Sequence, residues 1–254
     1  MSKRDDQIIE LVHKYGELSV QELSDLLGIS PSTVRRDLVS VGDHRFIERT
    51  HGGVTLATVI NYQNLCVNRV AIDPREVRSI ASRAADMIHP GDVVGLSGGE
   101  ICTYLAYLLR MKEDITVVTN AINIAVELVC LPGIQVRLTG GRLNAGSFEL
   151  TGKSLEPSLD GVHIQKFFLG TDGLSLDYGV TAHDEAEATA SREMMAHTAT
   201  NIVLADSRKF KITSFAQVAP LAEFQTTVTT ELVTNNILNE YQKTGIEIIV
   251  APII

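Results

Sequence analysis

Two different hydrophobic patterns follow each other along the chain. Near the start, apolar residues recur with helical spacing, as at Ile8 and Leu11. Further on, short apolar runs alternate with amphipathic stretches, a pattern that predicts strands alternating with helices. We therefore expect a small helical domain at 1–56, a linker at 57–73, and a larger, doubly wound and mainly parallel α/β domain at 74–254.

The first domain has the spacing of a helix-turn-helix. Ser19 and Glu22 have the pattern of a capping box, which predicts the start of a helix that ends at Gly28. Ser30 and Pro31 then predict the N-cap and first turn of a second helix. Two short helices joined by so tight a turn are typical of DNA-binding proteins.

The second helix and a predicted hairpin, or wing, over residues 46–56 carry candidate DNA contacts. Val34 and Leu38 form the apolar stripe of this helix, so its polar residues face outward. Arginine can bind guanine through two hydrogen bonds, and hydroxyl groups can contact phosphates and base edges. On pattern alone, a protein-interaction module with a solvated arginine pair stays open. The candidates are Ser30, Ser32, Thr33, Arg35, Arg36, Arg49 and His51.

Net charge does not support DNA binding through bulk electrostatics. The chain of 254 residues has a formal charge of −9, and residues 1–56 hold seven basic and nine acidic residues, a balance of −2. No apolar run is long enough to span a bilayer, and no signal-peptide pattern follows the first residues. The three cysteines are scattered and suggest neither a disulfide nor a zinc framework. We expect a cytoplasmic protein without a membrane partner.

Five predicted strand ends in the second domain carry small or polar residues. In open α/β sheets, ligands bind at the carboxyl ends of the strands, where glycines let amides approach an anion and basic side chains neutralise it. We therefore expect a shared crevice for a polyol or sugar phosphate, although each motif alone could be ordinary turn chemistry. The candidates are Ser97, Gly98, Gly99, Glu100, Thr119, Asn120, Gly140, Gly141, Arg142, Asp172, Glu185 and Lys209.

The residues from His183 to Glu187 include side chains of the kinds that bind metals or act as an acid/base pair. A helix start with Asp184 as its N-cap accounts for them more simply, since acidic residues favour the first turn of a helix. Cys102, close to the crevice, is interpreted as a small buried cysteine. We expect no metal and no cofactor.

The motifs of both domains resemble one family. Residues 23–38 read L-S-D-L-L-G-I-S-P-S-T-V-R-R-D-L and are followed by R-T-H-G-G at 49–53, which closely resembles the N-terminal signature of DeoR-family transcriptional regulators. Further motifs are similar to the effector domain of that family: V-V-T-N at 117–120, L-T-G-G at 138–141, F-L-G-T-D-G at 168–173 and A-D-S-R-K-F at 205–210. The resemblance covers nearly the whole chain. It implies a sensor fold similar to ribose-5-phosphate isomerase and a sugar-phosphate inducer that releases a repressor from an operon for sugar catabolism.

Two segments depart from the family pattern. The turn before the wing usually contains a glycine in a segment like E-x-x-G, whereas residues 42–46 read G-D-H-R-F. Where the family reads D-S-G-T-T, residues 97–101 read S-G-G-E-I, so the threonine hydroxyls that would face a phosphate are absent. The Glu100 carboxylate would repel a phosphate there. It is a solvated acid that points away, or the ligand offers hydroxyls or an amine instead. Residues 179–188 look closest to members that regulate amino-sugar or related carbohydrate genes.

These patterns are compatible with three functions to different degrees. A DNA-binding repressor with a sugar-type effector explains both domains, and it would act as a homodimer or homotetramer because paired recognition helices span two half-sites. A sugar-phosphate isomerase could use Asp172 and Lys209 as acid and base, but no motif pairs a base with an electrophilic stabiliser. A purely structural interaction protein leaves the polar strand ends unexplained. We expect a regulator that binds operator DNA and is not an enzyme.

Overall fold

The chain divides into two compact units, Met1–Asn61 and Tyr62–Ile254. The computed structural model describes residues 3–15, 17–41, 47–50, 52–56 and 72–254. Most of the expected linker therefore lies outside the described residues, and its boundaries stay a prediction. The two units are described separately below.

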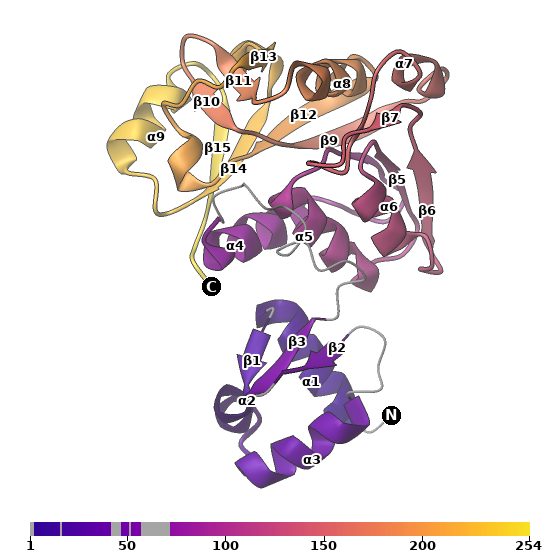
Figure 1. The fold of residues 1–254 in the computed structure, drawn as a ribbon. Helices are drawn as coiled ribbons and strands as arrows, with labels where there is room; N and C mark the ends of the chain where they lie inside the picture. The colour runs from indigo at the N-terminus through magenta and orange to yellow at the C-terminus, as the bar shows by residue number, and fades with distance from the viewer. Residues whose placement is uncertain (1–2, 16, 42–46, 51, 57–71) are drawn as a thin grey trace. The chain divides into compact units, whose positions relative to one another are not determined.

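The first unit is a three-helix domain with a small antiparallel sheet (Figure 1). Its helices are α1 (Lys3–Tyr15), α2 (Val20–Leu27) and α3 (Pro31–Val41), and its strands are β1 (Glu17–Ser19), β2 (Ile47–Arg49) and β3 (Gly53–Leu56), in the order β1-β3-β2. The core contains one or two apolar side chains from each helix, Ile8, Val12, Leu23, Val34 and Leu38. The predicted helix-turn-helix and wing are confirmed, and β1 was not predicted.

The second unit is built on a seven-stranded sheet in which every neighbouring pair is parallel. The strand order is β15-β14-β12-β9-β4-β5-β6. The strands are β4 (Val93–Leu96), β5 (Ile115–Thr119), β6 (Ile134–Leu138), β9 (Ile164–Gly170), β12 (Thr198–Leu204), β14 (Thr226–Thr230) and β15 (Glu247–Ala251). The doubly wound α/β fold predicted from the alternating pattern is confirmed.

Helices cover both faces of this sheet, as Figure 1 shows. On one face lie α4 (Pro74–Ala85), α5 (Glu100–Leu108) and α6 (Ile122–Leu128), and on the other lie α7 (Leu155–Ser158), α8 (Glu185–Ala196) and α9 (Asn235–Gln242). A buried cluster that includes Phe167, Met194 and Tyr241 fills the second face. Burial from both sides explains why the strands read as short, continuous apolar runs.

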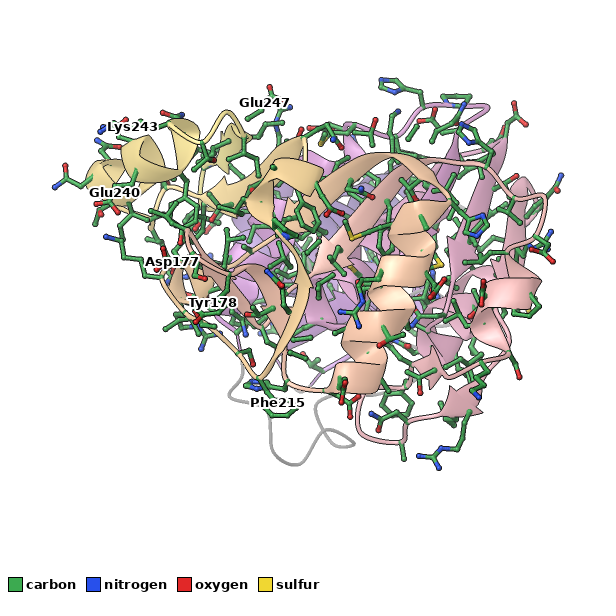
Figure 2. All side chains as sticks on the ribbon, turned by 90° about the horizontal axis from the view of Figure 1, so that it is seen from above. Asp177, Tyr178, Phe215, Glu240, Lys243 and Glu247 are labelled. Atoms are coloured by element: carbon green, nitrogen blue, oxygen red, sulfur yellow. The ribbon has the colours of Figure 1, made fainter. Side chains whose placement is uncertain are left out.

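Two small antiparallel additions were not predicted, because their strands are too short to leave a pattern. One is the hairpin of β7 (Arg142–Leu143) and β8 (Leu150–Thr151). The other is a sheet of β10 (Gly173–Ser175), β11 (Gly179–Ala182) and β13 (Ala216–Ala219). Tyr178 and Phe215 are exposed next to this sheet (Figure 2).

The chain changes direction within the large sheet at the pair β4 and β9. From β4 the chain proceeds outward through β5 to β6, whereas from β9 it proceeds the opposite way through β12 and β14 to β15. Such a topological switch point opens a crevice at the carboxyl ends of the two central strands. The fold therefore places the predicted crevice after Leu96 and Gly170, where β4 and β9 end.

Candidate functional site

Local hydrogen bonds stabilise the starts of the two helices of the helix-turn-helix, α2 and α3. The Ser19 hydroxyl accepts from the Glu22 amide at 3.2 Å, and the Glu22 carboxylate accepts from the Ser19 amide at 2.8 Å. Gly28 ends α2 with a φ of 65°, a left-handed conformation that favours glycine. The Ser30 hydroxyl accepts from the Thr33 amide at 3.3 Å at the start of α3. The capping pattern predicted from the sequence is confirmed.

Helix α3 presents a polar surface opposite its apolar stripe. Val34 and Leu38 are buried, whereas Ser32, Arg35 and Arg36 are exposed. Two neighbouring arginines on the exposed side of the second helix have the placement that major-groove recognition requires. The geometry therefore agrees with the orientation expected for a recognition helix.

The wing consists of β2 and β3, whose register pairs Arg49 with Val54. The backbone of Arg49 thus belongs to the wing, while its side chain and all of His51 lie outside the described residues. Their DNA contacts stay predictions. Close to the turn, the Gly52 carbonyl accepts from the Val20 amide at 2.9 Å, which ties the wing to the start of α2.

Replacing Gly53 with alanine is expected to disrupt this wing. A Cβ atom at residue 53 would overlap the Leu18 carbonyl oxygen and lie 2.7 Å from the Ser19 Cα, and backbone atoms cannot move aside as a side chain can. We expect a loss of about 1–3 kcal/mol in the free energy of unfolding of the first unit and weaker operator binding. Thermal unfolding and DNA-shift titrations of the full chain measure both.

Gly52→Ala is the matched control for this change. A Cβ atom at residue 52 meets nothing within 4 Å, so the substitution is expected to leave the thermal stability of the chain unchanged within error. Equal behaviour of the two variants would contradict the packing described for Gly53.

In the second unit, Ser97 lies at the switch point, directly after the end of β4. Its hydroxyl accepts from the Gly170 amide at 3.0 Å and lies 3.2 Å from the Gly98 carbonyl oxygen, to which it donates. Ser97 therefore links the ends of β4 and β9, and only 3% of its surface is exposed. Thr119 has a similar structural role, because its hydroxyl donates to the Leu96 carbonyl at 2.7 Å and accepts from an amide.

Asn120, at the end of β5, is buried and only partly satisfied. Its side-chain amide nitrogen donates to the Glu149 carboxylate at 2.9 Å and to the Leu150 carbonyl at 3.3 Å. Its side-chain oxygen Oδ1 has no hydrogen-bond partner among the described residues. An unpartnered acceptor with 2% exposure at a switch point favours a ligand-binding role.

The N-terminus of α5 lies at the same switch point, shortly after the end of β4. Gly99 is its N-cap, with a φ of 95° and no side-chain hydrogen bond, and a Cβ atom there would meet nothing within 4 Å. Glu100 is exposed, and its carboxylate accepts a hydrogen bond from the Ile72 amide. Burial raises the pKa of the Glu100 carboxyl, and the Ile72 amide and the Arg208 guanidinium oppose that rise. Both sequence-based alternatives for Glu100 stay predictions.

Asp172 and Lys209 come together at the ends of β9 and β12. The Lys209 ammonium lies 3.7 Å from one carboxylate oxygen of Asp172, and the other oxygen accepts from the His183 amide at 3.0 Å. Lys209 ends a short 3₁₀ turn that the buried Asp206 caps by accepting from the Arg208 amide. Asp206 thus fixes the turn from which Lys209 reaches Asp172.

The residues Gly140 to Arg142 have mainly a packing role. A Cβ atom at Gly140 would lie 2.5 Å from the Ser154 carbonyl oxygen, and one at Gly141 would lie 2.8 Å from the Thr151 backbone. These glycines let the chain after β6 pass close to the segment around β8. Arg142 is exposed on β7. The predicted role of Gly140, Gly141 and Arg142 in effector binding stays a prediction.

The acidic run before α8 is a helix cap. Asp184 accepts from the Ala186 amide at 2.7 Å and the Glu187 amide at 3.1 Å, as predicted, and Glu185 is exposed in the first turn. Among the described residues, no group of three or more histidine, cysteine or acidic side chains is arranged to hold a metal ion. In the same part of the chain, no helix is long and apolar enough to cross a membrane. Burial raises the pKa of the Cys102 thiol to about 12, which keeps it protonated.

Comparison with known families agrees with this two-part architecture. The DeoR-like helix-turn-helix domain matches residues 4–59, and the DeoR C terminal sensor domain matches residues 73–231. The chain belongs to the DeoR family. As a DeoR-family member it is a DNA-binding transcriptional regulator, and the enzyme alternative is not favoured.

Relatives of this DeoR-family chain match it over nearly its full length. A protein of Escherichia coli O157:H7 named as an aga operon transcriptional repressor is 31% identical over 250 residues, which are 98% of this chain and 93% of the relative. The HTH-type transcriptional repressor GlcR of Bacillus subtilis (strain 168) is 32% identical over 243 residues, 96% of this chain and 93% of the relative. A solved D-ribose-5-phosphate isomerase has a TM-score of 0.42 and 20% identity, covering 56% of this chain and 55% of that one.

Two buried acids of this DeoR-family sensor were missed by sequence reasoning. The Glu149 carboxylate accepts a hydrogen bond from the Asn120 side chain. The Glu76 carboxylate accepts one from the amide of Ser207, the first residue of the 3₁₀ turn. Both acids lie outside the polar strand-end motifs of the sequence, so no local signal marks them. Only the hairpin of β7 and β8 brings Glu149 back to the switch point.

Proposed function

We propose that this protein represses an operon for carbohydrate catabolism and is released from its operator by a sugar-type effector bound at the switch point. The unpartnered Oδ1 of Asn120, buried beside the uncapped start of α5, supports the effector site most directly. The helix-turn-helix in the same chain is the DNA-binding domain that effector binding at this site would regulate. Two relatives that match nearly the full chain are named as transcriptional repressors, which supports repression.

The operator-binding surface comprises the exposed side of α3 and the wing. Arg35 and Arg36 would enter the major groove, and the hydroxyls near the start of α3 would contact phosphates or base edges. The wing would reach the adjacent phosphates or minor groove. The full proposed set is Ser30, Ser32, Thr33, Arg35, Arg36, Arg49 and His51.

We place the effector among residues from the ends of four neighbouring strands and the helix starts beside them. The proposed set is Ser97, Gly98, Gly99, Glu100, Thr119, Asn120, Asp172, Glu185 and Lys209, and the hydrogen bonds of Ser97 and Thr119 between strand ends support it. Gly140, Gly141 and Arg142 support the covering hairpin instead. Amino sugars and their phosphates are the effector classes to test first, in view of the departure at residues 97–101.

Operator recognition by a chain of this kind calls for a symmetric assembly. Paired recognition helices must span half-sites about one helical turn apart, and an acidic monomer with a net charge of −9 would bind DNA weakly. We propose a homodimer or homotetramer acting in the cytoplasm, where the operator lies. Light scattering at operator-binding concentrations is expected to give at least twice the monomer mass, and a monomer would contradict this.

The central experiment measures the linkage between effector and operator. A thermal-shift screen of sugars, amino sugars and their phosphates identifies ligands, and the hits are titrated with and without the DNA upstream of the protein's own gene. We expect a true effector to weaken operator binding about 5- to 150-fold, and the operator to weaken effector binding by the same factor. A sugar that binds tightly without this reciprocal change would contradict the proposed function, as would a chain that binds no upstream DNA.

A further inference from the structure

Strand β6 is the last strand in the order of the large sheet, and Figure 1 shows it at the margin of that sheet. The Gly133 carbonyl accepts from an amide of β5 at 3.2 Å, and the Thr139 amide donates to a carbonyl of β5 at 2.9 Å. Successive residues of a strand direct their backbone groups to opposite sides, so the odd-numbered residues face β5. The amides and carbonyls of Val136 and Leu138 therefore point away from the sheet, and no described residue pairs with them.

The edge formed by β6 has none of the usual devices that prevent pairing with another chain. Free edges are commonly protected by proline, by outward lysines or by a β-bulge. Strand β6 reads I-Q-V-R-L and pairs with β5 in an unbroken register, so it contains no proline and no bulge. Its one charged residue, Arg137, donates to the Ser158 carbonyl of α7 at 2.7 Å, which holds the guanidinium on that face of the sheet. The edge is therefore open to main-chain hydrogen bonds.

Exposed apolar side chains accompany this edge on the face that α6 covers. Since Arg137 reaches α7 on the opposite face, the even-numbered Val136 and Leu138 project to the side of α6. Leu138 is 41% exposed. Val126 within α6 is 37% exposed, and Val129 at the C-terminal cap of α6 is 65% exposed. Apolar residues exposed together beside an open strand indicate an interaction surface.

The edge is complementary to itself. When two copies of β6 pair antiparallel about a two-fold axis at Val136, the outward groups of Val136 bond to their equivalents, and Leu138 lies opposite Ile134. On the other face, Arg137 then lies opposite the uncharged Gln135, so no like charges meet. The two α6 helices lie on the same face of the joined sheet, with their exposed valines toward the joint. Such a contact closes on itself as a dimer.

The opposite edge of the sheet, β15, suits such a pairing less well. Glu247 is exposed at the start of β15, and the exposed Glu231 lies beside its end, where the Glu231 amide donates to the Ala251 carbonyl at 3.2 Å. An antiparallel pair of β15 strands would bring Glu247 of one copy toward Glu231 of the other. Like charges opposite each other destabilise a strand pair, so charge favours β6 as the joint.

We propose that β6 pairs with β6 of a second copy of this chain and joins the two seven-stranded sheets into one continuous sheet, with an α6 helix from each copy over the joint. The inference rests on the proposed function, which calls for a symmetric assembly, and it specifies the surface that forms this assembly. Main-chain hydrogen bonds determine the register. The exposed apolar residues of α6 and β6 add the buried area that a pair of five-residue strands lacks.

Val136→Pro tests the pairing in the full chain. Proline removes the outward amide of residue 136 and no hydrogen bond to β5, a placement that edge strands tolerate. We expect the variant to keep its far-ultraviolet circular dichroism and to sediment with half the mass of the unsubstituted chain at micromolar concentration. Retention of the full mass by the folded variant would overturn the proposal.

Val250→Pro on β15 is the matched control. The Glu247 amide donates to the Gln225 carbonyl before β14, and the Ala251 carbonyl accepts from the Glu231 amide after it, so the odd-numbered residues of β15 face β14. The amide of Val250 therefore points outward, as that of Val136 does. The control is expected to keep the mass of the unsubstituted chain. Equal loss of mass in both proline variants would contradict a joint formed by β6 in particular.

Val136→Cys gives a second, independent test if the proline variant folds poorly. Residues directly opposite in an antiparallel pair have Cα atoms about 5.5 Å apart or less, which a disulfide can span. In a chain whose Cys66 and Cys130 are replaced by serine, mild oxidation is expected to produce a covalent dimer. Gln135→Cys in the same background is the control, because its equivalent lies two positions out of register and beyond disulfide reach. No covalent dimer with Val136→Cys, or as much with Gln135→Cys, would overturn the pairing.

Operator binding separates this inference from the proposed function. A dissociated Val136→Pro variant is expected to bind the operator about tenfold more weakly or less, because each subunit then binds one half-site alone. An oligomer that keeps its mass and its operator binding in this variant would uphold the proposed function and overturn the inference. An unsubstituted chain that is monomeric, or that binds no upstream DNA, would contradict the proposed function itself.

Discussion

Glu76→Ala is expected to lower the free energy of unfolding of the sensor domain by about 3–5 kcal/mol, a large share of the 5–15 kcal/mol that ordinarily stabilises a domain. The Glu76 carboxylate is 2% exposed and accepts three hydrogen bonds. The Ser207 amide and hydroxyl donate at 2.9 Å each, and the Thr230 hydroxyl donates at 2.6 Å. These bonds join the first helix of the sensor domain to the ends of β12 and β14.

The expected loss in the free energy of unfolding is large because a buried donor cannot form a hydrogen bond to water instead. The Thr230 side chain is fully buried, so removing its acceptor leaves a desolvated hydroxyl without a partner. Hydrogen bonds to an ionised acceptor are also stronger than neutral ones. Glu76→Gln keeps the shape but turns one oxygen into a donor facing other donors, so its loss should lie between those of alanine and the unsubstituted chain.

Urea unfolding followed by far-ultraviolet circular dichroism measures the effect, and the chain has no tryptophan to report it by fluorescence. Glu156→Ala is the control, because surface substitutions usually change stability by less than about 0.5 kcal/mol. A loss below about 1 kcal/mol for Glu76→Ala would show that these bonds are not maintained in solution. Because Ser207 starts the turn that carries Lys209, the variant should also bind any effector less tightly.

The sequence predicted the helix-turn-helix because its signals are local. The capping box at Ser19 and the cap at Ser30 involve residues three positions apart, and each forms the bond that its spacing predicts. The parallel sheet was predictable for a similar reason, since its strands are buried on both faces and read as apolar runs. These features need no knowledge of distant contacts.

The effector site could be predicted only in part, because long-range pairing builds it. Ser97 and Asn120 stood at recognisable strand ends, and both lie at the switch point. Glu149 reaches them through a hairpin whose two strands have two residues each, too short for any period to show. The Gly140-Gly141 pair looked like an anion-binding turn, yet its glycines are needed where two backbone segments pack closely. Identical sequence features thus have different roles according to the partner the fold brings to them.

Arg35→Ala and Arg36→Ala are each expected to weaken operator binding by about 1–3 kcal/mol, or about 5- to 150-fold. Both side chains are exposed on α3 opposite the buried Val34 and Leu38, so truncating them should not change the stability of the domain. The first unit is acidic overall, which leaves binding dependent on a few well-placed contacts rather than on its mean charge. Electrophoretic shift titrations across a range of salt concentrations measure the loss.

Salt dependence separates the two roles that each arginine can have. An arginine that reads a guanine gives a loss that depends on the base at one operator position and leaves the salt slope nearly unchanged. One that holds a phosphate weakens binding to all sequences alike and reduces the slope by about one. Arg83→Ala, an exposed arginine on α4 of the sensor domain, is the control and should change neither quantity. Unchanged operator binding in both Arg35→Ala and Arg36→Ala would mean that another surface of the chain meets the DNA, since no other pair of exposed cations lies on α3.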